Sequence, residues 1–92
     1  MGDLTIEMQP TPNPNAAKFT LNRQVAARGA TYRDPASADA SWARQLLGIA
    51  GVTQVFALND FIAITKGSGA SWEAIAPQVE RVLQSAFANQ GG

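Results

Sequence analysis

The residue types that carry out most enzyme chemistry are missing from this chain. Its 92 residues include neither cysteine nor histidine. Thiolate nucleophiles, imidazole bases and disulfides are therefore excluded, and soft metals and iron–sulfur clusters lose their usual protein ligands. Only carboxylates remain, and no pair of them has the spacing of a known metal loop. They are scattered at Asp3, Glu7, Asp34, Asp39, Asp60, Glu73 and Glu80. We therefore expect no cofactor, no metal site and no enzyme activity, but a protein that works by binding.

Three arginines recur at a spacing of five, at Arg23, Arg28 and Arg33. If they converged they would form an anion site, whereas along a solvated edge their aliphatic stems would cover apolar surface. The solvated edge is the commoner arrangement, and we expect it here. A Gly-Ser-Gly run at 67–69 lacks the Lys-Ser/Thr ending of a phosphate-binding loop, so no nucleotide site is predicted.

The composition predicts one folded domain over residues 1–92, with residues 89–92 frayed. Apolar residues make up 46% of the chain and charged residues 15%, as in globular proteins. Seven basic and seven acidic residues cancel, which argues against a nucleic-acid or membrane partner. No apolar run reaches membrane-spanning length, and Ile6 stands where a myristoylation motif needs Ser or Thr. We expect a cytoplasmic protein.

Two strands at residues 52–57 and 61–66, joined by a turn at 58–60, form the centre of the predicted fold. Both are rich in β-branched and aromatic residues. A two-residue loop would pair Leu58 with Phe61, and a four-residue loop would pair Phe56 with Phe61. Either register places Phe56, Phe61 and Ala63 on one face. The other face would carry Val55, Ile62 and Ile64.

The remaining elements are expected to cover this hairpin. Alternating residues predict strands at 4–9 and 17–21, with a possible short strand at 30–32. Helical periodicity predicts a helix at about 38–47, capped by Ser37 or Asp39. A second helix is expected from the cap Ser71 to about Ala88, with Pro77 bending it or delaying its start. The fold class is α+β: a two-layer sandwich with a mixed or mostly antiparallel sheet of about four strands and two helices on one face.

The proline-rich segment at 10–15 has two readings. Its three prolines lack N–H donors and push the preceding residues toward extended conformations. The segment could be a stiff connector between strands. The less common alternative is a recognition loop, because a rigid segment loses little entropy on binding.

Short motifs spread along the chain point to a known family. They are Pro10-Thr11-Pro12-Asn13-Pro14-Asn15, Lys18-Phe19, Arg44-Gln45-Leu46, Ile49, Gly51-Val52, Val55-Phe56, Asp60-Phe61-Ile62, Thr65-Lys66, Trp72 and Pro77. In these motifs the sequence resembles the N-terminal domain of Nfu/NifU-type iron–sulfur cluster scaffold proteins. The resemblance covers nearly the whole chain, and its most specific parts are the Thr-Pro-Asn-Pro-Asn and Asp-Phe-Ile segments. Departures are local: Ala17 replaces a larger apolar residue, Leu47 an aromatic one, and Leu58-Asn59 a Gly-Pro turn.

The resemblance implies a role without cluster ligation. Full-length family members continue into a second domain whose Cys-x-x-Cys motif binds the cluster, and this chain has no cysteine. What is implied is therefore an accessory interaction domain that helps a scaffold meet its client or donor proteins. Residue chemistry alone equally allows a general protein-binding or oligomerisation module unrelated to iron–sulfur chemistry.

Five residues are the candidates for a partner-binding surface. The proline-stiffened loop would present two amides, the hairpin two aromatic rings and its last residue a charge. They are Asn13, Asn15, Phe56, Phe61 and Lys66.

Overall fold

A computed structural model describes residues 4–87 of the chain. Within these residues, five strands form one antiparallel sheet in the order β1-β2-β5-β4-β3. The expected end of the second helix at Ala88 and the expected fraying of 89–92 lie outside the described residues. The strands are β1 (Ile6–Pro10), β2 (Ala16–Leu21), β3 (Ala26–Tyr32), β4 (Val52–Asn59) and β5 (Phe61–Lys66).

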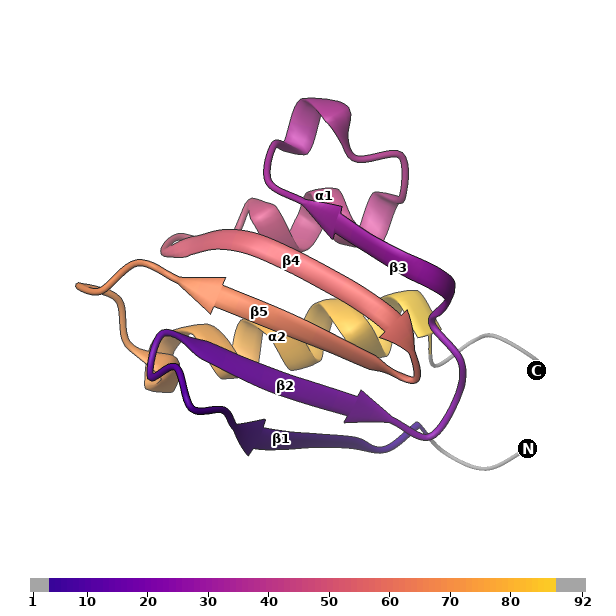
Figure 1. The fold of residues 1–92 in the computed structure, drawn as a ribbon, viewed down its shortest axis with the longest axis horizontal. Helices are drawn as coiled ribbons and strands as arrows, with labels where there is room; N and C mark the ends of the chain where they lie inside the picture. The colour runs from indigo at the N-terminus through magenta and orange to yellow at the C-terminus, as the bar shows by residue number, and fades with distance from the viewer. Residues whose placement is uncertain (1–3, 88–92) are drawn as a thin grey trace.

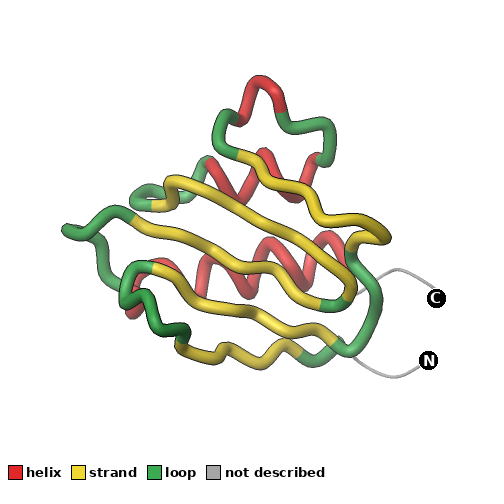
Figure 2. Tube along the Cα trace, in the orientation of Figure 1, coloured by secondary structure: helices red, strands yellow, loops and turns green. Residues whose placement is uncertain are grey.

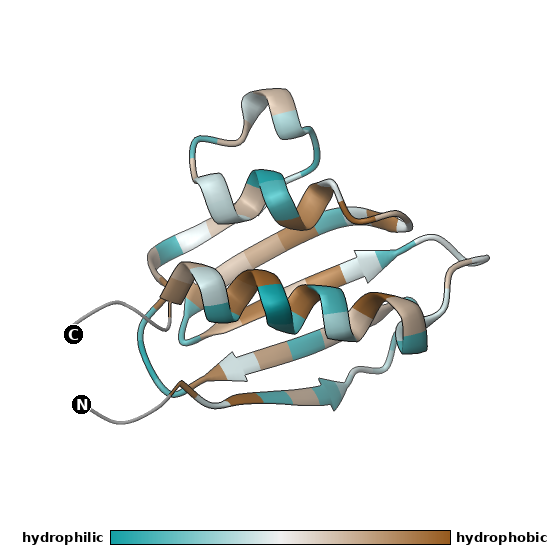
Figure 3. Ribbon diagram, turned by 180° about the vertical axis from the view of Figure 1, so that it is seen from behind, coloured by the Kyte–Doolittle hydropathy of each residue, from teal (hydrophilic) through white to brown (hydrophobic). Residues whose placement is uncertain are grey.

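Both α-helices of the described chain lie behind the sheet, and its other face is open (Figures 1 and 2). They are α1 (Ser41–Leu47) and α2 (Trp72–Phe87), and a short 3-10 helix at Pro35–Ser37 precedes α1. Seen from behind, both helices lie in front of the strands (Figure 3). The expected α+β sandwich is confirmed, with β3 as the additional strand.

The β4–β5 hairpin has the two-residue loop. Leu58 pairs with Phe61, and Asn59 adopts the left-handed backbone conformation, with φ 54°, that asparagine tolerates. The expected faces are confirmed, because Val55, Ile62 and Ile64 are fully buried against the helices. Phe56 and Phe61 are half-buried on the open face.

The core lies between the sheet and the helices. An aromatic chain links three elements, because the Trp42 ring packs 5.9 Å from Tyr32 and 5.6 Å from Phe87, measured between ring centroids. Such pairs add to the free energy gained from burial alone. The largest fully buried side chains are Phe19, Leu46, Val55, Ile62, Ile64, Ile75, Val79, Leu83 and Phe87.

Gly51 joins α1 to the hairpin at a position where other residues would not fit. Its φ is +97°, and a Cβ there would lie 2.7 Å from the Cβ of Ala70. A side chain at this position would therefore meet both backbone strain and a steric clash. The entry to β4 is thus held close to the loop that follows β5.

Two sequence expectations need correction. The strand expected at 30–32 extends back to Ala26, with an irregular register between Ala26 and Ala30 that hides the alternation. Neither Ser37 nor Asp39 caps α1: its N-cap is Ala40, without a side-chain bond. The physical reason is that Asp34 and the following proline start a separate 3-10 turn, and α1 begins only after it.

The two ends of α2 behave differently from each other. Ser71 caps the N-terminus as expected, because its Oγ accepts a hydrogen bond from the backbone N–H of Glu73 at 3.1 Å. The helix starts at Trp72 and continues through Pro77, so the proline does not delay its start. At the C-terminus, Arg23 Nη1 donates to the carbonyl oxygen of Phe87 at 2.6 Å. The helix is therefore fastened at both ends.

Truncating the core should test the face assignment. Ile62→Ala and Val79→Ala should each lower the free energy of unfolding by about 2–4 kcal/mol, because both side chains are fully buried between helix and sheet. Urea denaturation measures this, with the exposed helix variant Ser85→Ala as the control. Losses below about 0.5 kcal/mol at both core positions would mean that the opposite sheet face is the inner one.

Candidate functional site

The proline-rich loop at 11–15 is shaped by its own polar groups. Thr11 Oγ1 accepts from the backbone N–H of Asn13 at 3.1 Å and lies 2.9 Å from the carbonyl oxygen of Ala16, to which it can donate. The side-chain oxygen of Asn13 accepts from the N–H of Asn15 at 2.9 Å. This is the local bond that makes asparagine a turn residue. Asn13 thus folds the loop in addition to any contact outside it.

Asn15 and Lys66 bind each other inside the chain. The Lys66 backbone N–H donates to the Asn15 carbonyl at 2.7 Å, and Lys66 Nζ donates to Asn15 Oδ1 at 3.1 Å. Only 9% of Lys66 is exposed, because it follows Ile62 and Ile64 on the helix-facing side of β5. A buried ammonium needs such acceptors, since an unpaired charge is costly to bury.

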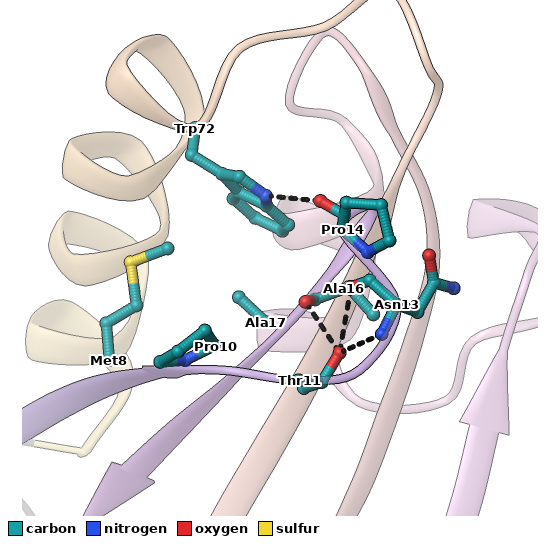
Figure 4. Close-up of a pocket in the computed structure, with 8 residues that line it drawn as sticks. All are labelled: Met8, Pro10, Thr11, Asn13, Pro14, Ala16, Ala17 and Trp72. Atoms are coloured by element: carbon teal, nitrogen blue, oxygen red, sulfur yellow. Dashed lines mark hydrogen bonds between the residues drawn. The ribbon is translucent and has the colours of Figure 1, made fainter.

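Trp72 closes the loop from α2. Its indole N–H donates to the carbonyl oxygen of Pro14 at 3.1 Å, and the Lys66 ammonium lies 5.8 Å from the centre of a Trp72 ring. Beside this bond is an open cavity of about 250 Å³ (Figure 4). Its lining is mainly apolar and comprises Met8, Pro10, Thr11, Asn13, Pro14, Ala16, Ala17 and Trp72.

Met8 and Trp72 were missed as site residues by sequence reasoning. Met8 pairs with the buried Phe19, yet 37% of it is exposed, and among the described residues it is the one large apolar side chain that is exposed. Its strand β1 is at the edge of the sheet, where the helices give less cover. The helical period of α2 groups Trp72 with the buried Ile75 and Val79, and no local signal shows that its N–H reaches Pro14.

Phe56 and Phe61 form a second, separate group on the open face. Their ring centroids are 6.1 Å apart, and Lys18 Nζ lies 4.6 Å above the Phe61 ring. The backbone of Gly29 lies beside Phe56, and a Cβ there would be 3.4 Å from the ring. Lys18 was also missed, since its approach to Phe61 depends on the pairing of β2 with β5.

The open face also holds an unpaired polar atom. Thr20 pairs with Phe61, and its Oγ1 is the one side-chain nitrogen or oxygen in the described part of the chain that is buried without a hydrogen-bond partner. Such an atom typically costs about 1–3 kcal/mol. This face of the sheet is therefore not optimised for stability alone.

The five predicted residues do not form one surface. Asn13, Asn15 and Lys66 meet at the proline-rich loop, whereas Phe56 and Phe61 meet on the open face. Lys66 and Phe61 belong to the same strand but point to opposite sides of the sheet. Two candidate sites therefore replace the single surface suggested by the sequence.

The three arginines have different surroundings. Arg23 binds the end of α2, Arg33 Nε donates to the Gln54 side-chain oxygen at 3.0 Å, and Arg28 is exposed on β3.

No group of three or more Asp, Glu, Cys or His side chains within the described ranges could hold a metal ion. Burial, and then the neighbouring Asp39 carboxylate, raise the pKa of Tyr32 above its usual value, so the phenol stays protonated near neutral pH.

The fold and the open face together define a class of small α+β sandwich domains with one uncovered sheet face. Comparison with known sequences then identifies the group. The chain belongs to the family described as "Scaffold protein Nfu/NifU N terminal", whose model matches residues 6–90. The resemblance read from the sequence motifs is thereby confirmed.

Relatives and solved structures agree with this assignment. The chain is 38% identical to the "NFU1 iron-sulfur cluster scaffold homolog, mitochondrial" of Drosophila persimilis, a match that covers 91% of this chain and 31% of the fly protein. It therefore spans about a third of the length of the curated relatives it matches. The crystal structure of SAV1430 from Staphylococcus aureus superimposes with a TM-score of 0.77 at 31% identity, covering 85% of this chain and 96% of that one.

A more distant neighbour supports the fold alone. The NMR structure of a NifU-like protein from Saccharomyces cerevisiae gives a TM-score of 0.78 at 22% identity, covering 90% of this chain and 77% of that one. None of the described helices is long and apolar enough to cross a membrane.

The bond between Asn15 and Lys66 should be measurable as a coupling. Asn15→Ala should lower the free energy of unfolding by about 1–2 kcal/mol, because the buried ammonium loses an acceptor. In a Lys66→Met background the same substitution should cost at least about 0.5 kcal/mol less, since no buried charge remains. Urea denaturation of the four proteins measures the coupling.

Gln45→Ala, exposed on α1, is the control for this cycle. Equal costs of Asn15→Ala in both backgrounds would show that the amide does not stabilise the ammonium.

Proposed function

We propose that this domain is a non-catalytic protein-interaction domain of iron–sulfur cluster assembly or delivery. Its partners would be iron–sulfur scaffold or client proteins, and neither nucleic acid nor membrane belongs to the proposal. Family membership supports the link to iron–sulfur biology. The cytoplasmic location expected from composition stays a proposal, and the mitochondrial location belongs to the fly proteins so named.

The cluster is cargo in this proposal and is not ligated by the chain. Iron–sulfur clusters are held by cysteine thiolates, in some cases with histidine, and the sequence provides neither. In the described residues the carboxylates do not gather into a group that could replace them. A domain of this composition therefore contributes recognition, while another protein or domain contributes the ligands.

The observation that carries the proposal is the open sheet face with its aromatic pair. Phe56 and Phe61 are only partly buried, although aromatic side chains usually gain most from complete burial. Buried aromatic anchors are also the residues that dominate the binding energy of protein interfaces. We propose that these two rings contact the partner directly.

The loop residues would act indirectly. Asn13, Asn15 and Lys66 were candidates for direct contact, and their side-chain oxygens or ammonium already bind groups within the loop. We propose that they hold the loop and the adjacent cavity in a fixed shape. A preformed surface binds with a smaller loss of entropy than a flexible one.

Reconstitution tests the absence of ligation. After anaerobic incubation with iron and sulfide and removal of the excess, the purified chain should be colourless and free of stoichiometric iron, because it lacks thiolates. Absorption spectra and iron analysis measure this, with a Cys-x-x-Cys protein as the positive control. A reproducible charge-transfer spectrum at one cluster per chain or per dimer would contradict the proposal.

Partner binding tests the role itself. The immobilised chain should bind one or more purified iron–sulfur scaffold or client proteins from the same organism. Phe61→Ala should weaken this binding by about 1–3 kcal/mol, as expected for an interface anchor. Gln84→Ala, exposed on α2, should bind like the unmodified chain.

Thermal unfolding must accompany this comparison, so that lost binding can be separated from lost folding. If no iron–sulfur protein binds and proteins outside iron–sulfur metabolism do, the domain is a general binding module.

A further inference from the structure

We infer that the open sheet face binds a protein segment in which acidic side chains stand beside apolar ones. This deepens the proposed function and rests on it, because it specifies the chemistry of the partner. The residues of the open face that would form this site are Lys18, Arg33, Phe56, Leu58 and Phe61. The open face is the side of the sheet turned toward the viewer in Figure 1.

The apolar part of this face lies on two neighbouring strands. Phe56 and Leu58 belong to β4 and Phe61 to β5, and strand alternation sends all three away from the helices. Leu58 is paired directly with Phe61, and the Phe56 and Phe61 rings are in contact range. The described residues place no helix or loop above them (Figure 1). A partner can therefore reach a continuous apolar strip.

The charges at this strip are not neutralised within the chain. Lys18 Nζ lies over the Phe61 ring, and no carboxylate among residues 4–87 forms an ion pair with it. Arg33 is held by Gln54, a neutral amide. Glu7 lies on the same face, because it pairs with Thr20, but its carboxylate accepts from the Gln9 side chain at 3.3 Å and forms no ion pair with Lys18.

These contacts favour a carboxylate as the missing partner. The ring beneath Lys18 is attracted to the ammonium but cannot cancel its charge. A partner carboxylate arriving above the ring would pair with the ammonium while an adjacent apolar side chain covers Phe56 and Leu58. Complementary charge of this kind chiefly determines which partner binds and how fast.

Two other occupants fit the face less well. A second copy of the chain would bring the same cations toward each other, and like charges across an interface are unfavourable. Nucleic acid is retained by many phosphate contacts, whereas this face offers two cations on a chain of zero net charge. An acidic and apolar protein segment satisfies both the strip and the cations.

The test uses two synthetic 14-residue peptides and the isotope-labelled full chain. Both peptides carry the same leucine and phenylalanine residues, and their charged positions are all glutamate in one and all lysine in the other. NMR titration reports where each binds and how tightly. The glutamate peptide should shift backbone amides of β2, β4 and β5 and bind more weakly as salt increases. The lysine peptide should not bind at this face.

Four variants sharpen the result. Lys18→Gln should weaken binding of the glutamate peptide about three- to fivefold, the upper part of the range expected for an exposed ion pair, and Lys18→Arg should keep the affinity. Phe61→Ala should weaken it at least about tenfold. Arg81→Gln removes an exposed cation from α2 and should change nothing.

Several results would overturn the inference. They are equal binding of both peptides, no binding of either, shifts confined to the cavity beside Trp72, or an unchanged affinity in Lys18→Gln. A concentration-dependent dimer in sedimentation that blocks the peptide would assign the face to a second copy.

The failure of this inference is distinguishable from the failure of the proposed function. If iron–sulfur proteins bind and Lys18→Gln leaves them unaffected, the function stands and the acidic partner is rejected. If the glutamate peptide binds as expected and no iron–sulfur protein does, the acidic partner stands and the proposed function is rejected.

Discussion

The alternation of side chains along β5 is the constraint on which both candidate sites depend. Because successive residues of a strand point to opposite faces, burying Ile62 and Ile64 beneath the helices also buries Lys66. The same alternation sends Phe61 to the open side. A buried lysine that needs acceptors and an uncovered aromatic ring are therefore two results of one register. A shift of one residue would reverse both, so the core and the sites cannot be changed independently.

The buried lysine explains the conformation of a loop whose sequence suggests a free recognition segment. Asn15 contributes a backbone and a side-chain oxygen to Lys66, and Trp72 holds the carbonyl of Pro14. The prolines of this loop restrict the unfolded chain and reduce the entropy lost on ordering. Most of its polar groups are used within the molecule. Its exposed chemistry is mainly that of the apolar cavity beside Met8.

Local patterns predicted much of the fold, and pairings between distant residues limited the rest. Alternation assigned Phe56 and Phe61 to one face, and helical periodicity with the Ser71 cap located α2. The length of β3 was missed because its register is irregular between Ala26 and Ala30. The start of α1 was misplaced because an earlier 3-10 turn uses the first cap. In the candidate sites, Asn13, Asn15, Phe56, Phe61 and Lys66 were foreseen, but their neighbours Met8, Trp72 and Lys18 were not. Lys18 reaches Phe61 only because β2 pairs with β5, and no local pattern in the sequence encodes that pairing.

The pairing of β2 with β5 has a consequence for the order of folding. The β1–β2 and β4–β5 pairs connect strands that are adjacent in sequence, but the seam between them joins Thr20 to Phe61. Closing that seam requires a long loop and is expected to be slower than forming either hairpin. The open face straddles the seam, with Lys18 on one side and the aromatic pair on the other. It therefore exists only in the completely assembled sheet, and a partner that needs both parts would distinguish the mature domain from its partly folded forms.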